Sequence, residues 1–62
     1  MKTKVLFKCI TDIETYIISS ENISLLKTII SQDGMAYIRV DYFDDELCIY
    51  SSIYCTNVEK IN

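Results

Sequence analysis

Two neighbouring segments of alternating character constrain the fold more than any other part of the chain. Residues 36–43 and 47–54 both have the pattern of β-strands, and two consecutive aspartates followed by Glu46 lie between them. A two-residue turn at these aspartates would place Val40 opposite Ile49 and give the hairpin one almost entirely aliphatic face. Asp-Asp is a poorer turn than Asp-Gly, so a longer loop remains an alternative. The pattern predicts an antiparallel hairpin with one buried face.

The opposite face of this hairpin carries aromatic residues where a solvated sheet would carry Lys, Glu and Thr. Tyr, Met and Arg are enriched in the cores of protein interfaces. We interpret this face as a self-association surface, and the alternatives are a second small core beneath the C-terminal tail or ordinary β-propensity. The self-association residues are Met35, Tyr37, Arg39, Tyr50 and Tyr54.

The N-terminal part of the chain also has the pattern of strands. Residues 4–10 alternate, so that Val5, Phe7 and Cys9 share one face, and residues 14–19 are β-branched and aromatic. A turn between them completes a second hairpin. The tail, residues 55–62, carries few apolar side chains and is expected to form a short extra turn or a frayed end.

The pattern between the two hairpins is typical of a helix. Apolar residues follow Ser20 at helical spacing, Ser20 suits an N-cap, and Gly34 suits a left-handed C-cap. We therefore expect a helix over residues 21–33. The predicted fold is α+β with the order ββαββ: a four-stranded, mostly antiparallel sheet with one helix packed on its aliphatic face, in one domain over residues 1–62.

Composition excludes several classes of protein. The chain has 62 residues, half of them hydrophobic, a net charge of −3, three cysteines and no histidine. Without histidine there is no imidazole base to activate a serine or cysteine, so we expect no enzyme, and neither a metal nor another cofactor. The odd number of cysteines, with no C-x-x-C spacing, favours free thiols and a cytoplasmic location. No transmembrane or secretory segment is expected, and therefore no membrane association.

An acidic segment around the hairpin turn is the second candidate surface. It either docks a basic surface of a larger protein or is a solvated turn that guards a strand edge. The partner-binding residues are Asp41, Phe43, Asp44, Asp45 and Glu46. Three lysines, Lys2, Lys4 and Lys8, mark the first strand, but aromatic neighbours for base stacking are missing and the chain is acidic, so nucleic acid is an unlikely partner.

These features favour a small acidic protein-binding module that acts as a homodimeric inhibitor or adaptor and blocks a larger partner. Size, charge and an isoleucine-rich composition offer an analogy with phage proteins of anti-defence or host-takeover type, which would act in the host cytoplasm. The alternatives are a regulatory domain that binds a small ligand at its dimer interface, and a nucleic-acid-binding module.

Overall fold

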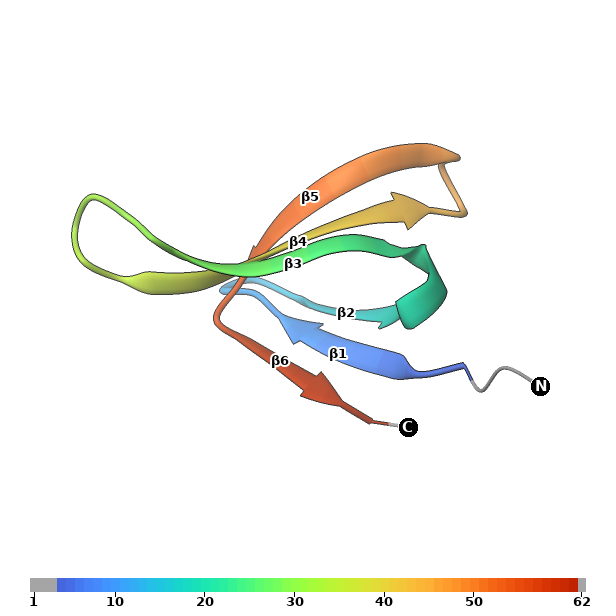
Figure 1. Ribbon diagram of the computed structural model, residues 1–62, viewed down its shortest axis with the longest axis horizontal. Helices are drawn as coiled ribbons and strands as arrows, with labels where there is room; N and C mark the ends of the chain where they lie inside the picture. Colours follow the sequence, from blue (N-terminus) through green and yellow to red (C-terminus); the bar gives the residue numbers. More distant parts are fainter. Residues whose placement is uncertain (1–3, 62) are drawn as a thin grey trace.

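The computed structural model describes residues 4–61 and shows an all-β protein (Figure 1). The described chain contains six strands in two three-stranded antiparallel sheets, and its only helical element is one 3-10 turn. The predicted ββαββ arrangement with a helix on one sheet face is therefore wrong. The elements are β1 (Leu6–Ile10), β2 (Thr15–Ser19), η1 (Ser20–Asn22), β3 (Ile23–Ile30), β4 (Ala36–Asp44), β5 (Ile49–Cys55) and β6 (Asn57–Lys60).

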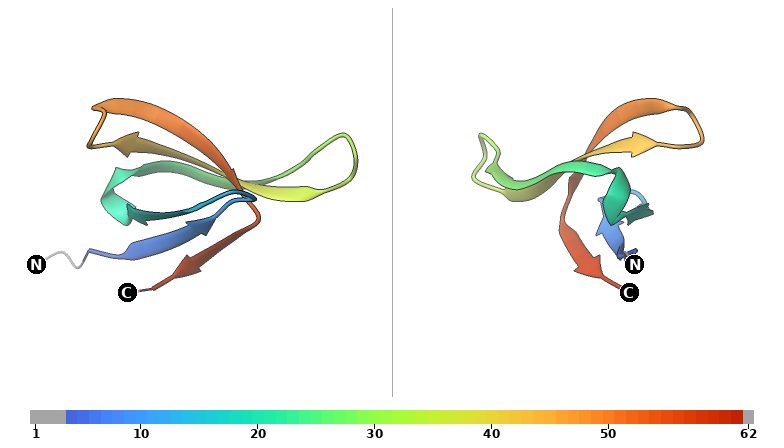
Figure 2. Two further views of the ribbon diagram at one scale, coloured as in Figure 1. Left: turned by 180° about the vertical axis from the view of Figure 1, so that it is seen from behind. Right: turned by 45° about the vertical axis from the view of Figure 1, so that its right-hand side comes forward.

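The chain passes from one sheet to the other at two corners. One sheet has the order β2-β1-β6 and the other β3-β4-β5, so η1 links the two at one corner and Thr56 at the second (Figures 1 and 2). At the second corner, the backbone N–H and the Oγ1 of Thr56 both donate to the carbonyl of Ile10, at 2.7 and 3.1 Å. Bends of this kind let the chain pass directly from a strand of one sheet to a strand of the sheet packed against it.

The core lies between the two sheets and contains residues from both. Alternation along the strands places the inward side chains of β4 and β5 against those of β1 and β2. The middle of the aliphatic face predicted for the hairpin is thus covered, by a second sheet rather than by a helix, while Leu47 and Ile49 remain 66% and 50% exposed. The buried residues are Cys9, Ile18, Val40, Tyr42 and Cys55, and the partly buried apolar residues packed against them are Phe7, Tyr16, Ile23, Ile38, Ile53 and Val58.

The segment predicted as a helix, residues 21–33, forms η1, the strand β3 and the start of a loop. Its apolar positions fit a helical stripe, but they also fit a strand, in which Leu26 lies opposite Val40 of β4. Four of the eight β3 residues are β-branched, which favours extended backbone. Leu26 and Ile30 remain 48% and 74% exposed, so the apolar residues that suggested a buried stripe do not form one.

The β4–β5 hairpin exists, but its register differs from the prediction. Val40 lies opposite Ile53, four residues beyond the expected Ile49. Because Asp-Asp lacks a glycine, the chain turns through a longer loop, residues 45–48, in which Cys48 takes a φ of 55°. A shift by an even number of residues keeps every side chain on its face, so the predicted division into an aliphatic and an aromatic face is confirmed.

The N-terminal hairpin is confirmed, and the tail forms more structure than expected. β1 pairs with β2, and the turn between them is closed by the Thr11 N–H, which donates to the Glu14 carbonyl at 2.9 Å. The tail was expected to be a turn or a frayed end, but β6 pairs with β1 over four residues. Lys4 forms an ion pair with Glu21 at 3.4 Å, whereas Lys2 lies outside the described residues.

The β3–β4 hairpin extends past the rest of the molecule as an arm (Figure 1). β5 pairs with β4 only as far as Ile38, so within residues 4–61 no third strand lies beside the pair Ile30 and Ala36. Gly34, predicted as a helix C-cap, instead turns the arm with a φ of 84°. No helix in residues 4–61 is long and apolar enough to cross a membrane.

Candidate functional site

The outer face of the β3-β4-β5 sheet gathers most of the predicted self-association residues. β4 and β5 place Arg39 opposite Tyr54 and Phe43 opposite Tyr50. The rings of Phe43 and Tyr50 meet edge to face, with centroids 5.1 Å apart. Tyr50 is 77% exposed and Tyr54 53% exposed, so this face offers aromatic surface to a partner. We call this surface the tyrosine face and define it as Tyr37, Arg39, Phe43, Tyr50 and Tyr54. The remaining predicted residue, Met35, lies in the loop of the arm.

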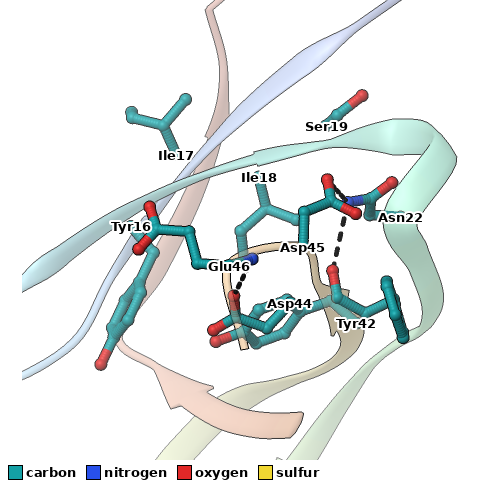
Figure 3. Close-up of a pocket in the computed structure, with 10 residues that line it drawn as sticks. Tyr16, Ile17, Ile18, Ser19, Asn22, Tyr42, Asp44, Asp45 and Glu46 are labelled. Carbon is teal, nitrogen blue, oxygen red and sulfur yellow. Dashed lines mark hydrogen bonds between the residues drawn. The ribbon is translucent and has the colours of Figure 1, made fainter. Parts of the chain in front are cut away.

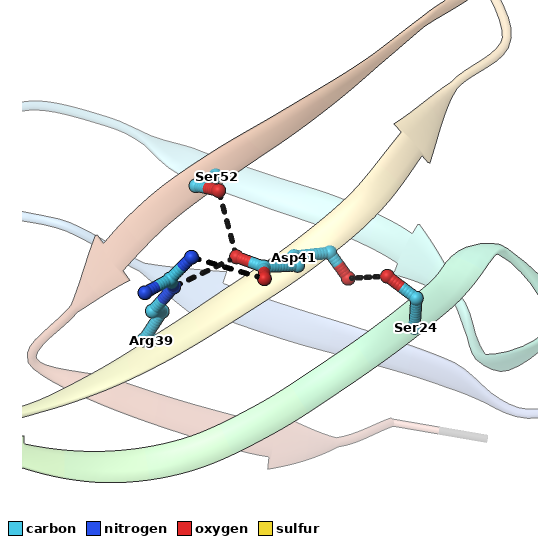
Figure 4. Close-up of polar contacts among 4 residues, drawn as sticks. All are labelled: Ser24, Arg39, Asp41 and Ser52. Carbon is cyan, nitrogen blue, oxygen red and sulfur yellow. Dashed lines mark hydrogen bonds and ion pairs between the residues drawn. The ribbon is translucent and has the colours of Figure 1, made fainter.

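A polar cluster occupies the middle of the tyrosine face (Figure 4). The guanidinium of Arg39 donates twice to the carboxylate of Asp41, at 2.9 and 3.2 Å, and the Ser52 hydroxyl donates to the same carboxylate at 2.7 Å. The hydrogen bonds from Arg39, followed by that from Ser52, hold the pKa of Asp41 below its ordinary value. Asp41 was predicted as part of the acidic partner-binding segment, but the structure places it here, neutralised by Arg39.

The remaining acidic residues form the loop between β4 and β5, and two of them shape it. One carboxylate oxygen of Asp44 accepts hydrogen bonds from the backbone N–H of Glu46 at 2.9 Å and of Leu47 at 3.3 Å. Asp45 accepts a hydrogen bond from Asn22 of η1 at 2.8 Å. Both carboxylates therefore build the loop as well as charging it, while the Glu46 carboxylate takes no part in these contacts.

A groove of about 410 Å³ lies between this acidic loop and β2 (Figure 3). Asn22 borders it, because its side-chain amide also donates to the Phe43 carbonyl at 3.1 Å and so ties η1 to the loop. The lining residues are Tyr16, Ile17, Ile18, Ser19 and Asn22 on one side and Tyr42, Phe43, Asp44, Asp45 and Glu46 on the other. The structure thus brings four of the five predicted partner-binding residues to one groove.

The three cysteines are free thiols in two different environments. Cys9 and Cys55 are fully buried, and burial, followed by the effect of neighbouring Cys55, raises the pKa of Cys9 to about 11. Burial also raises the pKa of Cys55. Cys48 is exposed on the acidic loop. Across residues 4–61, no three acidic or cysteine side chains come together in a way that could hold a metal ion.

The β2 side of the groove was not foreseen from the sequence. Asn22 was assigned to the start of a helix, and the residues it contacts are 21 and 23 positions away in the chain. Residues 16–19 have the pattern of an ordinary strand, and nothing in that pattern tells which edge of the strand lacks a neighbour. Only the strand order reveals that edge.

Comparison with known proteins adds no relative to these observations. No protein-family model matches the chain, and neither a curated protein nor a solved structure matches it significantly.

Proposed function

We propose that this chain is a small non-enzymatic protein-binding module that acts as a homodimer and inhibits or bridges a larger partner. The observation that carries the proposal is the tyrosine face, with Tyr50 and Tyr54 more than half exposed on one sheet surface. Tyrosine supplies a large contact area at low cost in conformational entropy. The work of such a protein is contact rather than chemistry, which agrees with a sequence that has no histidine and with two thiols held protonated in the core.

A second copy of the chain is the occupant that we assign to the tyrosine face. Arg39 and Asp41 on its central strand β4 neutralise each other within one copy. The neighbouring Lys27 is exposed on the edge strand β3, where a second copy can leave its charge in water. A face that is aromatic at its rim and neutral at its centre suits the self-complementary contact of a two-fold dimer. The partner of the dimer is expected to have a basic surface, because the acidic loop lies beyond the tyrosine face.

The mass of the protein in solution tests the proposal. Light scattering should give twice the 7.2 kDa chain mass at high micromolar concentration. Tyr50→Ala should shift the dimer toward monomer by about tenfold or more, because truncation of an anchoring aromatic commonly costs about 2 kcal/mol. Ile61→Ala is the matched control, since Ile61 is 48% exposed and directly follows β6, which belongs to the other sheet. A wild-type protein that stays monomeric at these concentrations contradicts the proposal.

A further inference from the structure

β2 presents a free backbone edge to the groove. In the β2-β1-β6 sheet, β2 is an edge strand, and within residues 4–61 no strand pairs with its outer side. The Ser20 N–H donates to the Val5 carbonyl at 2.7 Å. Every second residue of β2, counted back from Ser20, therefore directs its backbone N–H and C=O toward β1. Residues in an antiparallel ladder alternate in direction, so the N–H and C=O groups of Ile17 and Ser19 point outward.

The groove has the shape that an added strand needs. Four consecutive residues of β2 line it. Since successive side chains of a strand point to opposite faces, four in a row border the same hollow only when the strand's edge faces it. The opposite wall is the acidic loop, and the hydrogen bonds from Asn22 to Phe43 and Asp45 join the two walls on the η1 side. The groove is therefore a slot along a strand edge rather than a round pocket.

The charge of the slot selects between occupants. Three acidic residues, Asp44, Asp45 and Glu46, line it, and no lysine or arginine is among the ten lining residues. Two copies of this chain paired through β2 would bring their acidic loops together, which disfavours self-pairing at this edge. An incoming strand with lysine or arginine would instead neutralise the loop.

We propose that an extended, basic segment of the partner protein adds as a strand to the free edge of β2. Its backbone pairs with Ile17 and Ser19, its basic side chains face the acidic loop, and its alternate side chains lie on the face of Ile17, which is 56% exposed. The inference rests on the proposed protein-binding function and names the form of the partner. It also assigns binding residues on β2 in addition to the loop.

A capped peptide of six alternating lysine and valine residues is the probe. On the 62-residue chain, it should slow hydrogen exchange at the Ile17 and Ser19 amides, with chemical-shift changes centred on β2 and the acidic loop. Methylating one alternate set of its backbone nitrogens should weaken binding by about tenfold or more, and methylating the other set should not, because only one edge of an added strand pairs with β2. The inference is overturned if neither methylated peptide loses affinity, or if both lose it equally.

Two single-charge variants separate the acidic loop from general charge attraction. Glu46→Gln should weaken binding of the lysine–valine peptide, since its carboxylate lines the groove without helping to shape the loop. Glu59→Gln on β6 removes the same charge outside the groove and should leave binding unchanged. Equal weakening in both variants overturns the inference. The mass measurement on the same samples keeps the two proposals apart: a dimer that ignores the peptide refutes only the strand addition, and a monomer that binds it refutes only the dimer.

Discussion

Cys9 on β1 and Cys55 at the end of β5 lie next to each other in the core, and neither side chain has any exposed surface. Their positions follow from the second corner of the fold. Thr56, the residue after Cys55, is bonded to the carbonyl of Ile10, the residue after Cys9. The two cysteines therefore mark where the chain leaves one sheet at the end of β5 and enters the other as β6, and they act as small apolar side chains in the core.

This environment predicts sharply different reactivity among the three thiols. The thiolate is the nucleophile, and burial raises the pKa of both Cys9 and Cys55 while also excluding reagent. Iodoacetamide added to the native protein at about pH 8 should modify Cys48 alone, whereas all three cysteines should react in denaturant. Intact-mass spectrometry counts the adducts, and Cys48→Ser should reduce the native count to none. Modification of a core thiol as fast as Cys48 would contradict the packing.

The same burial predicts a loss of stability in alkaline solution. The folded pKa of Cys9, about 11, is above its ordinary value of 9.0, so between these values the unfolded chain releases a proton that the folded chain keeps. The free energy of unfolding should therefore be full below about pH 9 and fall by about 2 kcal/mol as the pH approaches 11. Urea titrations at several pH values measure this slope. Cys9→Ala should flatten it, and Cys48→Ser should not.

The lowered pKa of Asp41 predicts a loss of stability in acidic solution. Its pKa lies below the ordinary value, chiefly through the hydrogen bonds from Arg39. The stability it contributes is present above that ordinary value and is lost as the pH falls through the lowered one. In a carboxyl NMR titration, Arg39→Gln should raise the Asp41 pKa. Lys27→Gln should raise it less, because Lys27 acts only through the weakest of the charge effects on Asp41. An Asp41 pKa unchanged by Arg39→Gln would mean that the pair does not persist in solution.

The sequence was informative where the pattern had one physical meaning and failed where it had two. Alternation across β4 and β5 could arise only from strands, and the assignment of their faces held although the loop was longer than expected. Residues 23–30 fit a helical stripe, but half of them are β-branched, which favours a strand. Pairing with β4 decides between them, and that pairing produces an edge strand whose Leu26 and Ile30 stay exposed. A prediction that assumes apolar residues are buried would miss such a strand.

Of the two candidate surfaces, one could be predicted from the sequence and the other could not. The tyrosine face depends on alternation along β4 and β5, which the sequence shows, so most of its residues could be named beforehand. The groove depends on which edge of β2 lacks a neighbour and on the contact between Asn22 and Asp45, 23 positions apart. Strand order and long-range contacts of this kind follow from the packing of the two sheets. They leave no local signal in the chain.

Gly34 lies in the turn of the hairpin arm, where the sequence predicted the end of a helix, and substitutions there test this turn. Its φ of 84° lies in the left-handed region, and a Cβ added there would meet nothing within 4 Å, so any cost of a substitution comes from the backbone rather than from a clash. Gly34→Ala should lower the free energy of unfolding by about 1 kcal/mol, and Gly34→Asn by less, since asparagine tolerates this conformation better. Urea unfolding followed by circular dichroism measures both variants. Amide exchange should rise through local opening of the arm at Ile29 and Ser31, whose N–H groups face β4, and at Val40 in the core it should rise by no more than the global loss of stability requires. Equal stability of the alanine and asparagine variants would show that the turn does not hold this conformation in solution.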